Sequence, residues 1–307
     1  MTKVFIDGSA GTTGLRIVER LEARKDLQLL ILPDELRKSP AARADALASA
    51  DVAFLCLPDD AAKESAALAA GSKVKIIDTS TAHRTDPAWI YGMPELAGQK
   101  ERIAASSRIA NPGCHASGFV ALVAPLVEQG IVPKDAMLSC FSLTGYSGGG
   151  KKMIAQYEDD ACDRLLGAPR QYALTQSHKH LPEMAALCGL ETPPIFCPIV
   201  ADFYSGMEVT VPLFANQIKG SIEDIKALYK SYYTGGLIHF DEAADPDGML
   251  SALAYEGRDD MGVSVFGNDS RIILTARFDN LGKGASGAAI QNMNLLLGLP
   301  QATGLNV

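Results

Sequence analysis

The hydrophobic pattern of the first eighty residues alternates between short apolar runs and stretches with helical spacing. β-Branched and aromatic residues fill 3–7 (KVFID), and apolar positions then recur every three to four residues over 15–24 (LRIVERLEAR). The same pattern predicts further strands at 27–33, 51–58 and 73–78 and helices at 40–49 and 60–70. Such alternation is typical of an α/β domain with a doubly wound parallel sheet.

The pattern changes after residue 110. A buried helix is predicted to begin near Pro112, because Asn111 is a good N-cap and apolar residues follow at helical spacing from Phe119. Strongly alternating segments between 136 and 280 predict a second, α+β domain with a mixed sheet covered by one or two helices. The chain closes with a glycine turn and an apolar helix carrying Ala289 and Met293, which we expect to pack on the first domain.

Composition and charge narrow the function. The formal net charge is −8 with a pI near 5.2, and no lysine or arginine run is present, so a nucleic-acid partner is not expected. No apolar run reaches the roughly 20 residues that a membrane span needs, and the start lacks a secretory pattern. The six cysteines show no metal-ligand spacing. We therefore expect a cytoplasmic protein with free thiols and no metal site.

A glycine-rich turn, GSAGTTG, joins the first strand to the first helix. Glycines at 8, 11 and 14 let the backbone approach a pyrophosphate at a helix N-terminus, although a simple tight turn explains the spacing as well. Acidic residues that suit ribose hydroxyls (Asp34, Glu35) and basic residues that suit a 2′-phosphate (Arg37, Lys38) both follow the second strand. The cofactor's phosphate preference therefore stays open at this point.

Cys114 falls in the first turn of the predicted central helix. Unpaired N–H groups and the helix dipole favour a thiolate there, which suits a nucleophile, whereas the alternative is a small residue that merely fills space. A second glycine turn, 145–150, ends at Lys151 and Lys152 and is either an anion site or a mobile surface loop. The long irregular connection 79–108 is predicted to contain binding loops.

Two of the five histidines, His178 and His180, stand in the segment HKHLPEM. A histidine near its ordinary pKa is a natural proton carrier for thiol chemistry at neutral pH. The H-x-H spacing also suits a zinc site, but no cluster of further ligands accompanies it.

Five motifs in order carry a family resemblance: GSAGTTG, ANPGCHASG, GYSGGGK, HKHLPEM and NLGKGASGAAIQNMN. Together they resemble the N-acetyl-γ-glutamyl-phosphate reductases of arginine biosynthesis, in their short, compact subtype. Aspartate-semialdehyde dehydrogenases share the general layout, but HKHLPEM and KGASGAAIQNMN are similar to the glutamyl-phosphate enzymes.

The resemblance implies an NADP-binding Rossmann domain, 1–113 plus 284–307, and a catalytic and dimerisation domain, 114–283. It implies NADPH-dependent reduction of an acyl phosphate to the semialdehyde and phosphate through a cysteine thioester. A homodimer or homotetramer is expected. The alternatives are a related reductase for aspartyl or aminoadipyl phosphate, or a non-catalytic NADP-binding regulator.

The resemblance also implies site residues. The nucleophile is Cys114, and the acid/base is His178 or His180, of which we favour His178. The cofactor residues are Gly8, Ser9, Gly11, Thr12, Thr13, Gly14, Arg37, Asn280, Lys283 and Gly284, with Asn292 as a further candidate. Ser147, Gly148 and Lys151 face the substrate phosphate.

Two departures from the family pattern stand out. His115-Ala116-Ser117 replaces an aromatic residue and Pro-Thr after the cysteine, and Ser205 occupies a position where an arginine is usual. Because a serine cannot replace a guanidinium, phosphate recognition is expected to rest on Lys151, Arg84 or Arg108.

Overall fold

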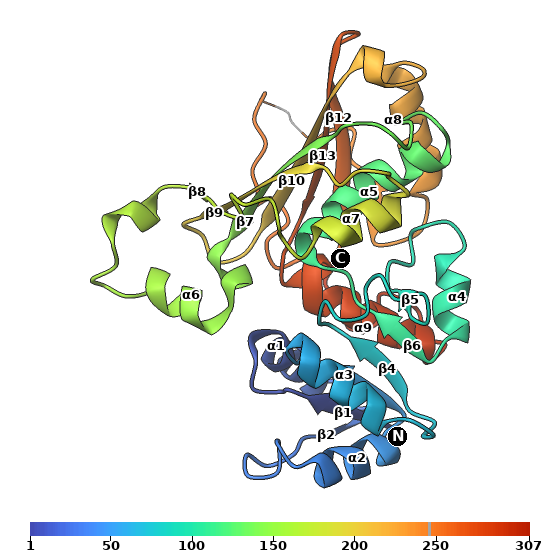
Figure 1. Cartoon of the computed structure of the whole chain (residues 1–307), viewed down its shortest axis with the longest axis vertical. Coiled ribbons are helices and arrows are strands. Elements are labelled where there is room, and N and C mark those ends of the chain that lie inside the picture. Colours follow the sequence, from blue (N-terminus) through green and yellow to red (C-terminus); the bar gives the residue numbers. More distant parts are fainter. Residues whose placement is uncertain (245–246) are drawn as a thin grey trace. The chain divides into compact units, whose positions relative to one another are not determined.

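The computed structural model describes residues 1–244 and 247–307, without the side chain of Thr12, and divides into two compact units (Figure 1). The first unit comprises Met1–Pro112 and Ala285–Leu305, and the second comprises Gly113–Gly284 and Asn306–Val307. Compared with the sequence-based division, Gly113, Gly284 and the last two residues lie in the second unit. Asn306 donates its N–H to the Asp259 carboxylate over 2.9 Å and accepts the N–H of Asp259, which ties it to the second unit.

The first unit contains a six-stranded, fully parallel sheet in the order β2-β1-β3-β4-β6-β5. Its strands are β1 (Thr2–Asp7), β2 (Leu27–Leu30), β3 (Val52–Leu55), β4 (Lys75–Asp78), β5 (Ile90–Tyr91) and β6 (Arg108–Ala110). Its helices are α1 (Thr12–Glu22), α2 (Pro40–Ser49), α3 (Asp59–Leu68), α4 (Gln99–Ala105) and α9 (Gly287–Leu296). The predicted doubly wound α/β architecture is confirmed.

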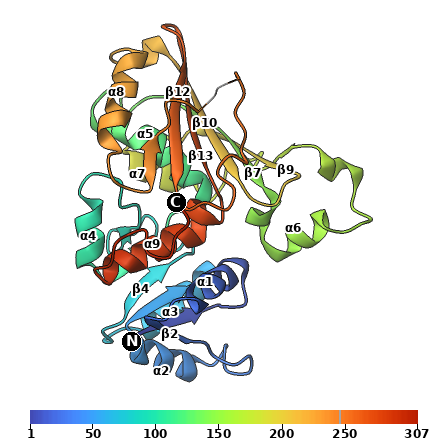
Figure 2. The ribbon, with the colours of Figure 1, turned by 180° about the vertical axis from the view of Figure 1, so that it is seen from behind.

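Side chains on alternate positions of the strands pack into two separate cores. Val4 and Ile6 of β1 face a core shared with α1, α4 and α9, whereas Phe5 faces a core shared with α2 (Figure 2). Both faces of the sheet are therefore covered, which explains why its strands are continuous apolar runs rather than alternating ones.

The strand order reverses at β1, because β2 lies on one side of it and β3 on the other. In doubly wound sheets, ligands bind outside the carboxyl ends of the strands at such a reversal. The glycine turn that follows β1 lies at this position.

The stretch 79–108 is more ordered than the sequence suggests. It contains β5 and α4 and runs into β6, so the prediction of one long irregular connection is wrong. The two strands are only two and three residues long, which is too short for a periodicity to be visible in the sequence.

The second unit contains a seven-stranded mixed sheet in the order β11-β12-β13-β10-β7-β9-β8. Its strands are β7 (Ser139–Gly145), β8 (Arg170–Gln171), β9 (Ile195–Ala201), β10 (Met207–Phe214), β11 (Ile238–Phe240), β12 (Met261–Gly267) and β13 (Arg271–Phe278). Its helices are α5 (Cys114–Glu128), α6 (Gly150–Tyr157), α7 (Leu181–Cys188) and α8 (Ile222–Tyr232). The predicted α+β mixed-sheet domain is confirmed.

Three of these helices cover one face of the mixed sheet. Helix α5 packs on β10 and β13 and contacts α7 and α8, while α8 also contacts β11 and β12 (Figure 1). Almost every residue of α5 is buried, so its first residue is held by packing over the whole length of the helix. Helix α6 belongs instead to an excursion of the chain between β7 and the edge strand β8.

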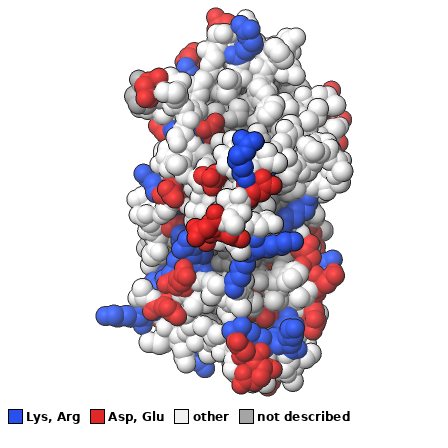
Figure 3. Space-filling model, turned by 90° about the vertical axis from the view of Figure 1, so that its left-hand side faces the viewer, with Lys and Arg blue, Asp and Glu red and all other residues white. Residues whose placement is uncertain are grey.

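The surface carries both signs of charge. On the face drawn in Figure 3, lysine and arginine side chains are interspersed with aspartate and glutamate. Among the described residues, no helix is long and apolar enough to cross a membrane.

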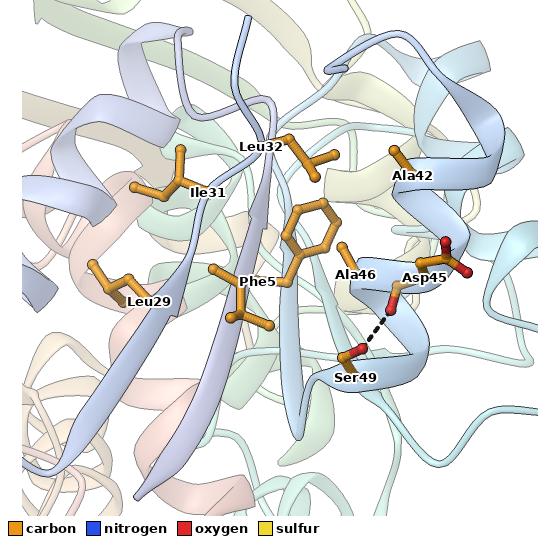
Figure 4. A pocket seen from close by; sticks show the side chains of 9 residues that line it. Phe5, Leu29, Ile31, Leu32, Ala42, Asp45, Ala46 and Ser49 are labelled. Carbon is orange, nitrogen blue, oxygen red and sulfur yellow. Dashed lines mark hydrogen bonds between the residues drawn. The ribbon is translucent and has the colours of Figure 1, made fainter. Parts of the chain in front are cut away.

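An open apolar groove of about 470 Å³ lies between β2 and α2 (Figure 4). It is lined mainly by aliphatic and aromatic side chains, and Asp45 is the one charged residue in its lining. Ser49 donates its hydroxyl to the Asp45 carbonyl over 2.7 Å. The groove therefore offers little to a phosphate, which needs several hydrogen-bond donors.

Substituting Gly8 with alanine tests how tightly the glycine turn packs. Gly8 has φ +87°, and a Cβ there would lie 2.3 Å from the Cys56 carbonyl oxygen. We expect Gly8→Ala to lower the free energy of unfolding by at least about 2 kcal/mol, because positive φ and a backbone clash add. Gly71→Ala is the control: its φ is +80° with open space around it, so about 1 kcal/mol is expected. Equal losses in urea titrations would contradict the close approach.

Candidate active site

Cys114 is the first residue of helix α5. Gly113 is the N-cap, and the cysteine is partly buried. The helix thus begins two residues later than predicted from Asn111 and Pro112. Asn111 is unable to cap α5 because it is engaged in the first unit, where its N–H bonds the Asp78 carbonyl over 2.7 Å and its Oδ1 accepts from Asn292. This later start of α5 places the Cys114 thiol closer to the positive end of the helix dipole than expected.

A buried carboxylate holds the residue before the cysteine. Glu183, on the first turn of α7, is 1% exposed, and its Oε1 accepts the backbone N–H of Gly113 over 2.8 Å. A charged acceptor at a helix N-terminus makes a strong hydrogen bond and also suits the dipole. Helix periodicity alone gave no reason to select this residue, although it lies within HKHLPEM.

Gly284 lies directly against the cysteine. A Cβ at this position would be 3.0 Å from the Cβ of Cys114, so a larger residue would push on the thiol. The N–H of Gly284 bonds the Asp279 carbonyl over 3.0 Å, and the buried Asp279 carboxylate accepts from Leu281 and Gly282. Gly284, predicted as a cofactor residue, is therefore also part of the cysteine's packing. Lys283 beside it is 3% exposed.

His115, which follows the cysteine, is buried, and the sequence analysis named it only as a departure from the family pattern. Its Nδ1 lies 2.6 Å from the Ser142 hydroxyl and its Nε2 lies 2.7 Å from the Tyr172 hydroxyl. Burial, with smaller contributions from His178 and Lys179, lowers the pKa of His115 to about 3. The ring is therefore neutral at physiological pH and binds both hydroxyls as a donor and an acceptor.

His178 and His180 lie beside His115. The ring centroid of His115 is 6.0 Å from that of His178 and 5.4 Å from that of His180, and the last two are 4.8 Å apart. Burial lowers the pKa of His178, with help from Lys179. The His180 N–H donates to His178 Nδ1 over 3.3 Å, which leaves the proton of a neutral His178 on Nε2.

Tyr172 connects this histidine cluster to the cysteine. Burial raises the pKa of Tyr172, and the charge of a Cys114 thiolate raises it further. The phenol therefore stays protonated and can donate a hydrogen bond. The structure thus places His178 and His180 beside His115, the residue that follows Cys114 in the chain, and joins Tyr172 to this cluster.

The second glycine turn forms a 3-10 turn, Tyr146–Gly149, followed by helix α6. Lys151 is exposed in the first turn of α6, and Gly148 is also exposed. Ser147 is 1% exposed, and its hydroxyl accepts from Asn280 Nδ2 over 3.0 Å. The exposed backbone of Gly148 and the Lys151 ammonium are groups that an anion requires.

Asn280 lies behind this turn. Its Oδ1 accepts the Gly206 N–H over 2.9 Å while its Nδ2 bonds Ser147, and the residue is 2% exposed. Both polar groups thus have partners within the second unit, and the nicotinamide contact of Asn280 stays a prediction. Asn292 is likewise buried and donates to the Gly92 carbonyl and to Asn111 within the first unit.

Ser205, which occupies the position where the family usually has an arginine, makes a buried hydrogen bond. It is 5% exposed and donates its hydroxyl to the Asp279 carboxylate over 2.9 Å, so it supports the segment that leads to Gly284. It takes no part in phosphate binding in this geometry.

The first glycine turn has the geometry of a pyrophosphate cradle. Gly11 is the N-cap of α1, and a Cβ at Gly14 would lie 2.3 Å from the Gly8 carbonyl oxygen. Ser9 is buried and Thr13 partly buried, whereas the predicted side-chain contact of Thr12 lies outside the described part of the chain. Small residues and free-standing N–H groups at a helix start fit the diphosphate of a nicotinamide dinucleotide.

A buried ion pair fixes the strand that leads into this turn. Asp7, 4% exposed, accepts Arg43 Nε of α2 over 3.0 Å and the Ser65 hydroxyl of α3 over 2.6 Å. Two helices are thereby anchored to the carboxyl end of β1.

The three candidate arginines, Arg37, Arg84 and Arg108, differ in the groups to which their guanidinium donors bind. Arg37 follows β2, is partly exposed, and forms an ion pair over 2.5 Å with Asp34, whose side chain is 82% exposed. Arg84 is buried and donates to the carbonyls of Asn111 and Thr79, which makes it a support for the backbone.

Arg108 donates to backbone carbonyls, and its contact with the substrate phosphate stays a prediction. It stands at the amino end of β6 and donates to the Val74 carbonyl over 2.9 Å, at the sheet edge opposite the glycine turn. Within residues 1–244 and 247–307, no group of three or more histidine, cysteine or acidic side chains is placed to hold a metal ion.

The neutral state of His115 predicts a pH dependence of stability. Its native pKa of about 3 lies below the ordinary value near 6.5, so between these pH values the unfolded state binds more protons. The free energy of unfolding should fall with decreasing pH by up to about 1.4 kcal/mol per unit because of this residue. His115→Gln should show a shallower slope in urea titrations between pH 7 and 5. Parallel slopes for both proteins would refute a neutral, buried His115.

Comparisons with known proteins agree with this geometry. Residues 114–280 match the family model of the semialdehyde dehydrogenase dimerisation domain, and residues 33–105 match that of the semialdehyde dehydrogenase NAD-binding domain. Aspartate semialdehyde dehydrogenase II of Vibrio cholerae, solved as a complex with ASA, has a similar fold with a TM-score of 0.73. Its sequence is 18% identical, over 97% of this chain and 98% of that one.

Closer sequence relatives are N-acetyl-γ-glutamyl-phosphate reductases. The second such reductase of Nostoc sp. is 46% identical over 99% of both chains. That of Brucella ovis is 46% identical over 96% of this chain and 99% of the relative. By these matches along nearly its whole length, the chain belongs to the N-acetyl-γ-glutamyl-phosphate reductase family of semialdehyde dehydrogenases.

Proposed function

We propose that this protein reduces N-acetyl-γ-glutamyl phosphate to N-acetylglutamate semialdehyde and phosphate, with NADPH as the reductant, in arginine biosynthesis. The observation that carries the proposal is the position of Cys114. It lies at the start of a buried helix, precedes the neutral His115, and is close enough to Tyr172 for a thiolate to raise the pKa of that phenol. A thiol held in this way suits acyl transfer, because a thioester accepts hydride and a carboxylate resists it.

The Cys114 thiolate attacks the acyl carbon, and the C–O bond to the phosphate breaks. N–H groups in the first turn of α5 have no acceptor within the helix, so they stabilise the oxyanion that forms on the acyl oxygen. Glu183 keeps this turn in place through Gly113. NADPH, when bound, would supply the hydride for reduction of the thioester. The departure of the aldehyde then restores the Cys114 thiolate.

His178 stabilises the phosphate as it leaves by donating a hydrogen bond. Its neutral tautomer carries a hydrogen on Nε2, because Nδ1 accepts the His180 N–H. Burial lowers the pKa of His178, so the ring donates this hydrogen bond in its neutral form and the phosphate leaves as an anion. His180 then acts as a positioning residue through its backbone.

The turn 145–151 holds the departing phosphate. Gly148 and Lys151 are both exposed there, and they offer backbone and ammonium donors. Ser147 is kept in place by Asn280 from behind, so the turn is supported before the anion binds.

NADP is the proposed form of the cofactor. The cradle of Gly8, Gly11 and Gly14 holds the pyrophosphate, and Arg37 after β2 pairs with the 2′-phosphate in exchange for Asp34. A guanidinium forms a charge-assisted bidentate pair with a phosphate, whereas its hydrogen bond with a neutral ribose hydroxyl is weaker.

The protein is proposed to form a homodimer through the outer face of the mixed sheet. Phe141, Ile195, Phe214 and Ile273 are between 42% and 61% exposed. Strand register places them on the face away from α5, since Phe141 and Ile273 pair with Thr210 and Pro212 of β10. Such an apolar face suits a second copy of the chain, and sedimentation velocity that reports monomers at micromolar concentration would argue against it.

A spectrophotometric assay tests the proposed reaction in reverse. The wild-type protein is mixed with N-acetylglutamate semialdehyde, phosphate and NADP⁺ or NAD⁺, and the reduced cofactor is measured. We expect phosphate-dependent reduction of NADP⁺, with lower activity for NAD⁺ and for the aspartate and N-acetylaminoadipate analogues. Cys114→Ser should lose at least about a thousandfold in kcat, because the nucleophile is removed.

Cys162→Ser is the matched control, because Cys162 is an exposed thiol of the same unit. It should retain wild-type activity. Substantial turnover by Cys114→Ser would refute the nucleophile, and a preference for another semialdehyde would refute the proposed substrate.

A further inference from the structure

An arginine without an acidic partner lies on β8, the edge strand of the mixed sheet. Arg170 Nη2 donates to the Tyr157 hydroxyl over 3.1 Å, and its guanidinium carbon is 5.5 Å from the centroid of that ring. Its Nε is buried and has no hydrogen-bond partner. Among the described residues, no carboxylate pairs with Arg170.

Two other arginines of the same unit have carboxylate partners. Arg258 forms a bidentate pair with Asp260, with distances of 2.7 and 2.6 Å, and the buried Arg277 bonds Asp241 over 3.1 Å. A guanidinium always carries its charge, and a buried donor without an acceptor is costly. Arg170 is therefore prepared for an anion that the chain itself does not supply.

Strand register places Arg170 on the same face as the histidine cluster. Arg170 pairs with Val200 of β9, which pairs with Thr144 of β7. The Tyr172 N–H bonds the Pro198 carbonyl, and Pro198 pairs with Ser142. Because residues two apart on a strand share a face, Arg170 and Tyr172 point to the same side.

Two sets of residues that pair across β7, β9 and β8 lie next to different parts of the site: Ser142 and Pro198 with Tyr172, and Thr144 and Val200 with Arg170. Ser142 and Tyr172 are the two hydrogen-bond partners of His115. Thr144, in the second set, is followed directly by the turn 145–151. Arg170 is thus in register with Thr144, which precedes the proposed phosphate turn. It lies two residues along its strand from Tyr172, which contacts His115.

We propose that Arg170 binds the α-carboxylate of the substrate and thereby selects the amino-acid part of the acyl phosphate. This inference rests on the proposed function. The substrate carries two anionic groups, and the phosphate is already assigned to the turn 145–151. The remaining anion is a planar carboxylate, whose carbon is separated from the acyl carbon by three carbon atoms. A guanidinium can donate to both of its oxygens.

Tyr157 keeps the guanidinium ready for this partner. It is 8% exposed, and its ring stacks on Tyr146 with centroids 4.7 Å apart. Tyr146 is the first residue of the 3-10 turn that precedes Lys151. The position of Arg170 is therefore linked through two aromatic rings to the turn that holds the phosphate.

The test compares Arg170→Gln with Arg164→Gln, since Arg164 is an exposed arginine on the same excursion of the chain. The KM for N-acetylglutamate semialdehyde should rise about 30-fold in Arg170→Gln, as for the loss of a charge-assisted pair. The KM values for phosphate and NADP⁺ should stay within about twofold of wild type. Arg164→Gln should match wild type in all three.

A substrate analogue identifies the group that Arg170 holds. The α-methyl ester of N-acetylglutamate semialdehyde lacks the carboxylate charge, so wild type should use it about 30-fold less well than the acid. Arg170→Gln should use the ester and the acid equally well. Tyr157→Phe, which removes only the hydroxyl, should raise the KM for the acid by a smaller factor and decides the question if Arg170→Gln does not fold.

Three results would overturn the proposal. They are a rise in the phosphate KM instead of the semialdehyde KM, continued discrimination of acid from ester by Arg170→Gln, and kinetics of Arg170→Gln equal to those of Arg164→Gln. A failure of the proposed function looks different: wild type would then prefer another semialdehyde. The same acid and ester comparison with that aldehyde would still decide the role of Arg170.

Discussion

The start of helix α5 is the constraint on which the catalytic unit depends. Four neighbours fix its first residues. Glu183 bonds the N-cap Gly113, Gly284 leaves room for Cys114, and Ser142 and Tyr172 hold His115. The body of the helix is buried against the mixed sheet. A nucleophile needs its reacting atom held within a fraction of an ångström, and this arrangement meets that need with backbone and buried side chains rather than with a loop.

The electrostatic character of the site follows from burial. His115 is kept neutral, the pKa of His178 is lowered, and the pKa of Tyr172 is raised. The cluster therefore brings no positive charge of its own near neutral pH, and the stabilisation of negative charge falls to N–H groups and the helix dipole. Preorganised dipoles of this kind cost little reorganisation during the reaction. In the proposed mechanism the half-buried His178 donates a hydrogen bond from Nε2, while the buried His115 stays a hydrogen-bonded support.

The sequence predicted most of the fold because its signals are local. Period-two and period-3.6 patterns located β1, α1, β3 and α5, and the family motifs located Cys114, His178 and His180. Elements of two or three residues, such as β5 and β8, leave no periodicity and were missed. The start of α5 was misplaced because Asn111 has the chemistry of a cap, but its hydrogen bonds are made with Asp78 and Asn292.

Site residues that depend on distant contacts were also beyond the sequence. Arg84 and Arg108 have the charge that a phosphate needs, yet their donors serve backbone carbonyls. Asn280 has the chemistry of a cofactor contact, but Gly206 and Ser147 use both ends of its amide. Glu183, His115 and Arg170 became visible only when packing and strand register joined segments far apart in the chain. Residue type therefore located the chemistry, and tertiary contacts decided which residues perform it.

The central claim is that the acyl group passes through a thioester on Cys114, and its most direct test is trapping of that acyl-enzyme. Wild-type protein is incubated with N-acetylglutamate semialdehyde and NADP⁺ without phosphate, then denatured in acid, digested and analysed by mass spectrometry. One N-acetylglutamyl group should appear on the peptide that contains Cys114 and disappear when phosphate is added before quenching. An active protein whose acyl group is found on another cysteine, or on none, would contradict the account.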